Sequence, residues 1–129
     1  MTGLKVECVD WSDEAQEALS IESFNCSVLD IKRQVIDDRA ALFKITRNDE
    51  TLGFYVLRVD KLEAGYEGVI FALACKNSEF DMVETLEPIM RSQFINCKSI
   101  RLHTARGGLV KKLTKLGYMP QEFVMKKFL

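Results

Sequence analysis

The stretch from residue 69 to residue 75, Val-Ile-Phe-Ala-Leu-Ala-Cys, is apolar at every position. It is short enough to be a strand, and a strand that is apolar on both sides needs cover on both of its faces. A central strand of a sheet meets that requirement. The run therefore predicts a sheet with this strand in its interior, entered through a loop at residues 60–68 that contains two glycines.

The residues before this strand predict two helices and three further strands. Alternating apolar side chains indicate strands, and a 3.6-residue repeat indicates helices. In chain order we expect a strand at 4–10, a helix from Ser12 to about Phe24, a helix from Val28 to near Asp37, and a hairpin of 41–47 and 51–59 that turns at 48–50.

The helix expected after the central strand contains Pro88. Met82, Leu86 and Met90 fall on one apolar stripe, but a proline inside a helix removes a hydrogen bond. We therefore expect this helix either to begin near Thr85, so that Pro88 falls in the tolerated first turn, or to be kinked.

The last third of the chain reads strand, short helix, strand. Residues 99–106 alternate, Gly107 and Gly108 end that strand, and an amphipathic helix follows to Leu116. Gly117 should end the helix in a left-handed conformation, and residues 122–129 read as a closing strand. Because a helix joins 69–75 to 99–106, these two strands should pair in parallel.

This ending resembles the C-terminal end of the GNAT (Gcn5-related N-acetyltransferase) superfamily. Leu113, Lys115, Gly117 and the aromatic Tyr118 carry the resemblance, and Gly53 with its following aromatic residues resembles the start of the family's third strand. The resemblance implies an α/β (α+β) fold with a GNAT-like mixed central β-sheet of about six or seven strands flanked by about four helices. It also implies a single GNAT-like domain at residues 1–129.

The family resemblance implies a site for acyl-CoA at the junction after the central strand. In the family, glycines there let backbone amides approach the pyrophosphate, whereas residues 76–84 of this chain contain no glycine and include the acids Glu79, Asp81 and Glu84. We therefore expect no cofactor; if the chain is catalytic, acetyl-CoA or another acyl-CoA would contact residues at the end of the strand and in the junction. These are Leu73, Cys75, Lys76, Asn77 and Ser78.

Three residues are candidates for acid–base chemistry. Glu67 could deprotonate an ammonium acceptor, and His103 is the chain's one histidine. Residues 107–117 lack the asparagine, alanine and acid-donating tyrosine of the family pattern, so Tyr118 is the nearest phenol. Each has a structural alternative: Glu67 and His103 as surface residues, and Tyr118 as a packing aromatic.

Charge is unevenly distributed along the chain. Residues 98–129 carry eight basic residues and one acid, a net +7, whereas residues 1–97 carry a net −8. A basic end of this kind predicts a partner with an acidic protein surface or a phosphate-bearing ligand. The expected basic patch is Arg101, Arg106, Lys111, Lys112 and Lys115; the alternative is that these are dispersed, solvated charges. Nucleic acid is disfavoured because no reading motif is present, and a homo-oligomer stays open.

Other features bound the class of protein. No apolar run is long enough to span a membrane, and the N-terminus lacks the apolar core of a signal peptide, so we expect a cytoplasmic protein with no membrane partner. The four cysteines form no Cys-x-x-Cys pair, which predicts buried, reduced thiols and no metal site.

Two functions follow from these features. The first is a degenerate GNAT-fold protein, a pseudoenzyme that acts as a binding or assembly component through its charged surfaces. The alternative is a divergent acyl-CoA-dependent N-acyltransferase acting on an amine.

Overall fold

A computed structural model describes residues 3–21, 27–76, 79–104 and 107–129 of the chain. The described residues contain one sheet of five strands in the order β1-β2-β3-β4-β5. The first four strands pair antiparallel, and β4 pairs in parallel with β5, as the sequence predicts. The strands are β1 (Leu4–Val9), β2 (Ala40–Arg47), β3 (Glu50–Leu62), β4 (Gly65–Cys75) and β5 (Ser99–Arg101).

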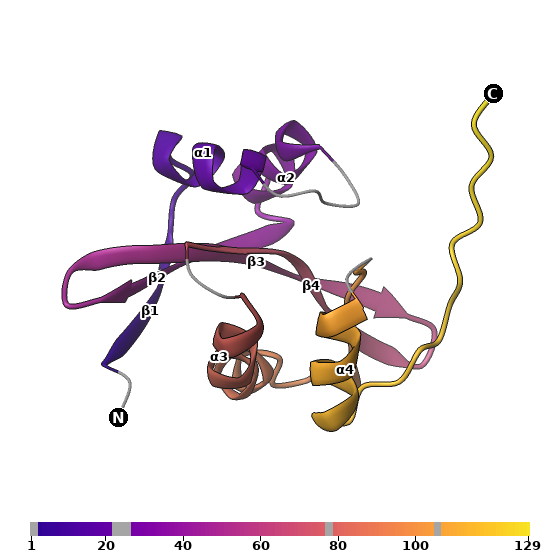
Figure 1. Ribbon diagram of the computed structural model, residues 1–129. Helices are drawn as coiled ribbons and strands as arrows, with labels where there is room; N and C mark the ends of the chain where they lie inside the picture. The colour runs from indigo at the N-terminus through magenta and orange to yellow at the C-terminus, as the bar shows by residue number, and fades with distance from the viewer. Residues whose placement is uncertain (1–2, 22–26, 77–78, 105–106) are drawn as a thin grey trace.

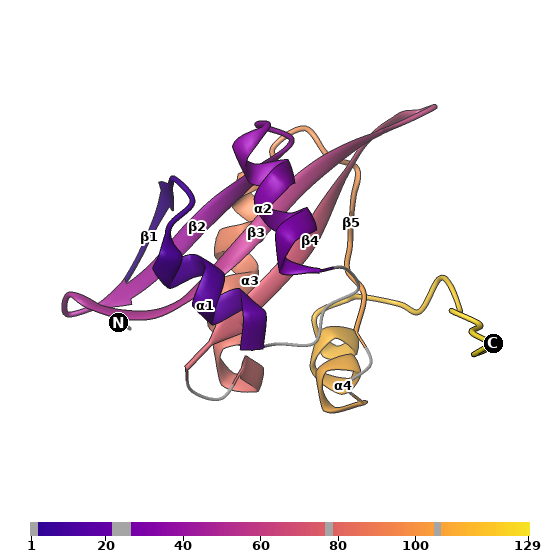
Figure 2. The ribbon, with the colours of Figure 1, turned by 90° about the horizontal axis from the view of Figure 1, so that it is seen from above.

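Helices cover both faces of the sheet. Figure 1 shows α1 (Asp13–Ile21) and α2 (Val28–Ile36) on one face and α3 (Glu79–Gln93) and α4 (Gly107–Lys115) on the other. Seen from above in Figure 2, α1 and α2 lie across the middle strands. None of the helices in the described ranges is long and apolar enough to cross a membrane.

Strand β3 divides the core into two layers. Phe54 and Val56 pack with α1 and α2, whereas Tyr55 and Leu57 pack with α3. All four side chains are buried, because successive side chains of a strand point to opposite faces and both faces are covered. A third cluster joins α3 to α4 through Val83, Leu109 and Leu113.

The helix ends follow the sequence signals. The Ser12 hydroxyl accepts a hydrogen bond of 3.1 Å from the Ala15 amide and caps α1. At the end of α4, Gly117 has a φ of +98° and donates to the Thr114 carbonyl, while the Tyr118 amide donates to the Leu113 carbonyl. This pair of bonds is a Schellman motif, which satisfies carbonyls that the helix leaves free.

The sheet has fewer strands than the six or seven expected. The prediction of a closing strand at residues 122–129 is wrong, because this segment is exposed and lies outside the sheet. In the described residues, the strand predicted at 99–106 is paired only over Ser99–Arg101. Alternating side chains suit a segment to a sheet, but hydrogen bonds to a neighbouring strand are what place it there.

The loop predicted at residues 60–68 is also wrong. β3 continues to Leu62 and β4 begins at Gly65, so Asp60 pairs with Glu67 across a hairpin. Gly65 has a φ of +138° beside the turn, and Gly68 lies against the ring of Phe94. Both glycines therefore serve the hairpin and its packing, whereas composition alone suggested a loop.

Helix α3 begins at Glu79, so the predicted start at Thr85 is wrong. The side chain of Pro88 is exposed, while Leu86 and Met90 on the opposite stripe are buried. Burial of that stripe stabilises the helix on both sides of the proline. The hydrogen bond that proline cannot make is lost on the face turned to solvent, where water can bind the freed carbonyl.

The cysteines are less buried than the sequence predicts. Cys8 is exposed on β1 at the edge of the sheet, and Cys75 and Cys97 are half-buried. Cys26 lies outside the described residues. A strand side chain is buried by what packs over its face of the sheet, and little packs over Cys8, which is exposed. Across the residues that are described, no three His, Cys, Asp or Glu side chains form a metal-binding group.

A substitution at Gly53 tests the close packing of β3 against β4. A Cβ atom there would meet the backbone oxygen of Ala74 and lie 2.8 Å from the Cα of Cys75. We expect Gly53→Ala to lower the free energy of unfolding by about 2 kcal/mol or more, measured by urea denaturation, because backbone atoms cannot move aside cheaply. Gly107→Ala is the control, since no atom lies within 4 Å of an added Cβ there. Equal stability of the two variants would contradict this packing.

Candidate functional site

Five polar side chains are joined where β4 pairs with β5, and we call them the β4–β5 polar network. They are Arg58, Asp60, Glu67, Ser99 and Arg101. Arg58 Nε lies 2.7 Å from Asp60 Oδ1 and its Nη2 lies 3.0 Å from Oδ2, a bidentate pair. Arg101 Nη2 donates to the same Oδ2 at 2.9 Å, so two guanidinium groups share one carboxylate.

Glu67 lies inside this network. Its Oε2 accepts a hydrogen bond of 2.9 Å from the Ser99 hydroxyl, and its Oε1 lies 3.4 Å from Arg101 Nε. Its side chain is 19% exposed. The sequence placed Glu67 in a loop as a candidate base, whereas the structure places it in β4, with each of its oxygens in contact with β5. The Arg101 contact is an ion pair without a hydrogen bond, since Arg101 Nε has no hydrogen-bond partner among the described residues.

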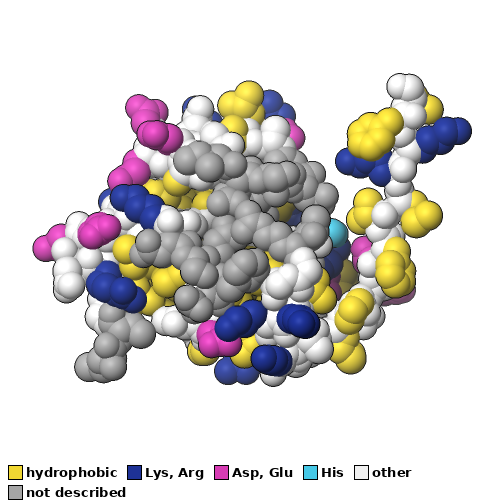
Figure 3. Space-filling view, in the orientation of Figure 1, with side chains coloured by type: hydrophobic (Ala, Val, Ile, Leu, Met, Phe, Trp, Pro, Cys, Tyr) yellow, Lys and Arg dark blue, Asp and Glu magenta, His cyan; other side chains and the backbone are white. Residues whose placement is uncertain are grey.

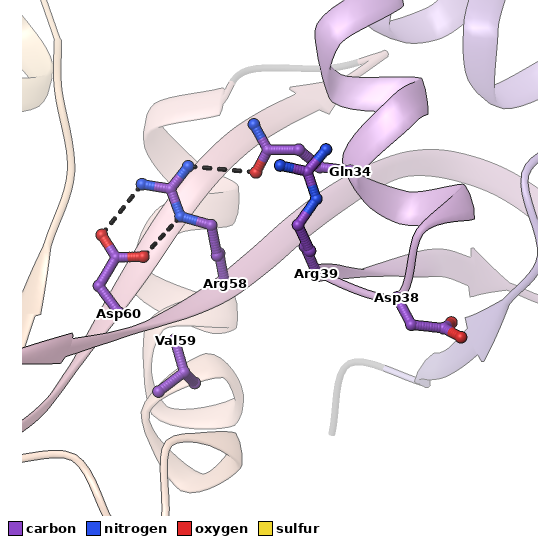
Figure 4. Close-up of a pocket in the computed structure, with 6 residues that line it drawn as sticks. All are labelled: Gln34, Asp38, Arg39, Arg58, Val59 and Asp60. Atoms are coloured by element: carbon purple, nitrogen blue, oxygen red, sulfur yellow. Dashed lines mark hydrogen bonds and ion pairs between the residues drawn. The ribbon is translucent and has the colours of Figure 1, made fainter.

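The network continues into a cavity of about 520 Å³ between the end of α2 and the end of β3. Figure 4 shows Arg58 between Asp60 and Gln34, whose Oε1 accepts a hydrogen bond of 3.2 Å from Arg58 Nη1. The Arg58 guanidinium also lies 4.7 Å from the centre of the Phe71 ring. The cavity is lined by Gln34, Asp38, Arg39, Arg58, Val59 and Asp60.

Sequence analysis missed the Arg58 side of this site. A signal was present, since Arg58 and Asp60 are two residues apart on one strand and therefore face the same side. The contribution of Gln34 had no sequence signal, because it depends on how α2 packs on the sheet.

Phe71 occupies an irregular position in β4. Val56 pairs with Ala72 and Leu57 pairs with Ile70, so Phe71 is an extra residue in β4 at a bulge. It packs in the same cluster as Ala72, on the side of α1 and α2. The bulge therefore turns an aromatic ring toward Arg58, where the ring supports the guanidinium.

The other two candidate catalytic residues lie apart from this network. His103 is exposed after the end of β5. The Tyr118 hydroxyl donates to Glu87 Oε1 at 3.4 Å, and Glu87 is a buried residue of α3. Burial, and then the charge of Glu87, raise the pKa of Tyr118 to about 12. Tyr118 is therefore a weaker acid than an ordinary tyrosine and ties the end of α4 to α3.

The predicted acyl-CoA contacts lie at the diverging end of β4. Leu73 and Cys75 are half-buried and pack toward α3, and the exposed Lys76 donates its amide to the Leu52 carbonyl at 2.8 Å. Asn77 and Ser78 lie outside the described residues, as do the side chains of Glu79 and Asp81. The described junction presents no glycine before α3 begins.

Glu84 contacts the neighbouring helix instead of standing free at this junction. Its Oε1 lies 2.8 Å from Lys112 Nζ of α4. The hydrogen bond from Lys112 and the charge of that ammonium group lower the pKa of the Glu84 carboxyl. The pair therefore neutralises one of the three acids that the sequence places at the junction.

The residues of the expected basic patch have different surroundings. Arg101 belongs to the β4–β5 polar network and Lys112 is paired with Glu84, whereas Lys111 and Lys115 are exposed on α4. Arg106 lies outside the described residues. Figure 3 shows lysine and arginine side chains gathered on this side of the molecule, over α3 and α4.

By sequence, neither a protein-family model nor a curated protein matches the chain. Solved structures do match its fold. An acetyltransferase from Trypanosoma brucei is 15% identical with a TM-score of 0.62, and the match covers 98% of this chain and 99% of that one. Glucosamine-6-phosphate N-acetyltransferase from Arabidopsis thaliana is 16% identical with a TM-score of 0.62, over 97% of both chains.

A third match is a transcriptional regulator from Bacillus halodurans, 12% identical with a TM-score of 0.66, over 97% of this chain and all of that one. Identities this low establish the architecture alone. Together with the order of elements and the parallel pairing of β4 with β5, these matches show that the chain has the fold of the GNAT acetyltransferases, at low sequence identity to them.

Proposed function

We propose that this chain is a GNAT-fold protein that does not transfer acyl groups and that acts as a binding component for an acidic protein surface. The observation that carries the proposal is the engagement of Glu67. Both of its carboxylate oxygens contact β5, through Ser99 and Arg101, so the carboxylate joins the two strands. A general base needs a lone pair directed at the substrate proton.

Two further features support the absence of acyl transfer. Tyr118 has a raised pKa and its hydroxyl is directed to Glu87, so it is poorly suited to protonate a leaving thiolate. The junction from β4 to α3 has no glycine to let phosphate groups approach the backbone closely. The cofactor site and the acid–base groups are therefore both altered.

The exposed lysines of α4 support the binding role. Lys111 and Lys115 project from a helix, and the last third of the chain has a strong excess of positive charge. Sites for small phosphate ligands are usually concave, whereas a helix surface suits contact with another protein. We therefore assign these lysines to an acidic protein surface in preference to a phosphate-bearing small molecule.

One of the matched structures is described as a transcriptional regulator. A protein of this architecture can therefore be described by a role other than acetyl transfer, which is compatible with a binding function for this chain.

The second candidate function is a divergent acyl-CoA-dependent N-acyltransferase. The observation in its favour is the separation of β4 from β5, which pair only from Glu67 to Val69 on the β4 side. Beyond Val69, β4 continues to Cys75 paired with β3 and no longer with β5. An acyl chain could enter between the diverging strands, and an amine would then approach from the cavity lined by Asp38 and Asp60.

Calorimetric titration with acetyl-CoA separates the two functions. We expect no saturable heat at micromolar cofactor, because residues 76–84 contain no glycine to let phosphate groups approach the backbone closely. Saturable micromolar binding would make the enzyme the better reading. Glu67→Gln and His103→Asn would then identify the base, as the variant that loses turnover and keeps cofactor affinity.

The titration of the tyrosines tests the role of Tyr118. The pKa values of Tyr55 and Tyr118 are both raised to about 12, chiefly by burial. Because the folded-state pKa exceeds the unfolded value near 10, these two groups stabilise the fold below pH 10, and that contribution is lost as the pH rises toward 12.

Absorbance of the phenolate should therefore show two tyrosines ionising near pH 12. Tyr118→Phe should remove one of them, and Tyr66→Phe, at an exposed position, should leave both. If the step that Tyr118→Phe removes lies near pH 10, the hydroxyl is neither buried nor held by Glu87, and an acid role returns.

Charge reversal tests the binding surface. With poly-glutamate as the acidic probe, Lys111→Glu combined with Lys115→Glu should weaken binding at least about tenfold, and binding of the unaltered protein should fall steeply with salt. Lys5→Glu combined with Lys32→Glu, on β1 and α2, reverses the same number of charges away from α4; it is the matched control and should have little effect. An equal effect of both changes would assign the binding to net charge. Free inorganic phosphate that competes as well as poly-glutamate would favour the phosphate-bearing ligand.

A further inference from the structure

The far end of the β3–β4 hairpin has apolar side chains that are open to solvent. Figure 2 shows the hairpin extending beyond the helices, because α3 ends at Gln93 while the two strands continue. Val59 of β3 is 51% exposed and Tyr66 of β4 is 45% exposed. Ile95, in the turn after α3, is 83% exposed. Exposed apolar side chains that gather in one region mark a surface that binds something.

These three side chains line a cavity of about 410 Å³ on the face of the sheet that α3 covers. Its other walls are Gln93, Phe94, Asn96 and Cys97. Backbone hydrogen bonds hold the turn in place, since the Cys97 amide donates to the Phe94 carbonyl at 3.3 Å and the Lys98 amide donates to the Tyr66 carbonyl at 2.9 Å. The walls are therefore fixed to one another, and the volume suits a small molecule.

Gln93 supplies a hydrogen-bond donor to this cavity. Its Oε1 accepts a hydrogen bond of 2.7 Å from the hydroxyl of Tyr55, which is completely buried. That bond orients the carboxamide group, because only its oxygen can accept. The Nε2 group is then what Gln93 offers to a ligand, so the ligand should carry an acceptor atom.

The edge of the cavity is basic. Lys61 of β3 pairs with Tyr66 of β4, so both side chains lie on the same face of the hairpin. Lys98 lies on the other side of Tyr66, since a Cβ atom at Gly65 would be 3.7 Å from Lys98 Cδ. Two ammonium groups at the edge of an apolar cavity attract an anionic group of a ligand.

This cavity is separate from the sites described above. The acids of the same strands, Asp60 and Glu67, belong to the β4–β5 polar network, which contacts α2 on the opposite face of the sheet. Tyr66 precedes Cys75 by nine residues of β4, which is about 30 Å along the strand from the junction with α3. Binding here therefore requires neither an acyl-CoA site nor the lysines of α4.

We propose that this cavity binds a small molecule with an aromatic body and a carboxylate. The rings of Tyr66 and Phe94 line the cavity and suit an aromatic body, which would cover the exposed Val59. The carboxylate lies at the edge, near Lys61 and Lys98. The occupant is a small molecule because the exposed apolar side chains are the walls of a cavity and do not form a flat patch.

Calorimetric titration of the full chain tests the ligand class with two probes, naphthalene-1-acetate and its neutral amide, naphthalene-1-acetamide. The acid should bind saturably and at least about threefold more tightly than the amide, since two exposed ammonium groups add a modest attraction. Lys61→Gln combined with Lys98→Gln should remove this preference. An acid and an amide that bind the unaltered protein equally would overturn the proposed class.

A lining variant tests the cavity itself. Ile95→Glu should weaken binding of the acid at least about tenfold, because it sets a carboxylate against that of the probe. Ile36→Glu makes the same change at a 59% exposed position of α2 and should have little effect. Circular dichroism confirms that both variants are folded. Equal weakening by both variants, or no saturable binding to the unaltered protein, would overturn the site.

Cys97 reports where the probe binds. Naphthalene-1-acetate should slow alkylation of this thiol by iodoacetamide, followed by mass spectrometry of the peptides. It should leave the rate unchanged at Cys8, which is exposed on the distant strand β1. A probe that binds without protecting Cys97 lies elsewhere, which overturns the site. A dimer in light scattering that Ile95→Glu dissociates would assign the cavity to a second copy and would overturn it as well.

Discussion

A parallel ladder of three residue pairs joins β5 to β4. Glu67 pairs with Ser99, Gly68 with Ile100 and Val69 with Arg101. So short a ladder contributes few hydrogen bonds, and side chains supply further contacts between the strands. Arg101 reaches both Asp60 and Glu67 from β5, and the ring of Phe94, just after α3, lies against the backbone of Gly68. The position of β5, and of the chain that follows it, depends on these contacts.

The same contacts surround the candidate base. The carboxylate of Glu67 contacts Ser99 and Arg101 of β5. The guanidinium groups of Arg58 and Arg101 share the carboxylate of Asp60. Removing this carboxylate would leave both partly buried guanidinium groups without this partner. The fold is that of the acetyltransferases, and the residues of the β4–β5 polar network link β3, β4 and β5. Fold and function have to be argued separately for such a chain.

The end of the chain has the opposite character. Helix α4 is anchored at its C-terminus by two backbone bonds and by Tyr118, and beyond that point residues 119–129 are exposed. The exposed lysines of α4 lie just before this segment in sequence, so the basic and the apolar features of the last third are close neighbours along the chain.

The sequence by itself determined the features that depend on local patterns. Periodicity, capping and connectivity are specified by neighbouring residues. They predict the strand at residues 69–75 with both faces covered, the first two helices, the Gly117 cap and the parallel pairing of β4. Tertiary structure decided the rest. Helix α3 passes through Pro88 because burial of its opposite face outweighs one lost hydrogen bond. Glu67 is a strand residue bound to Ser99 and Arg101 because β5 lies beside it, and no local pattern encodes contacts between residues so far apart in sequence.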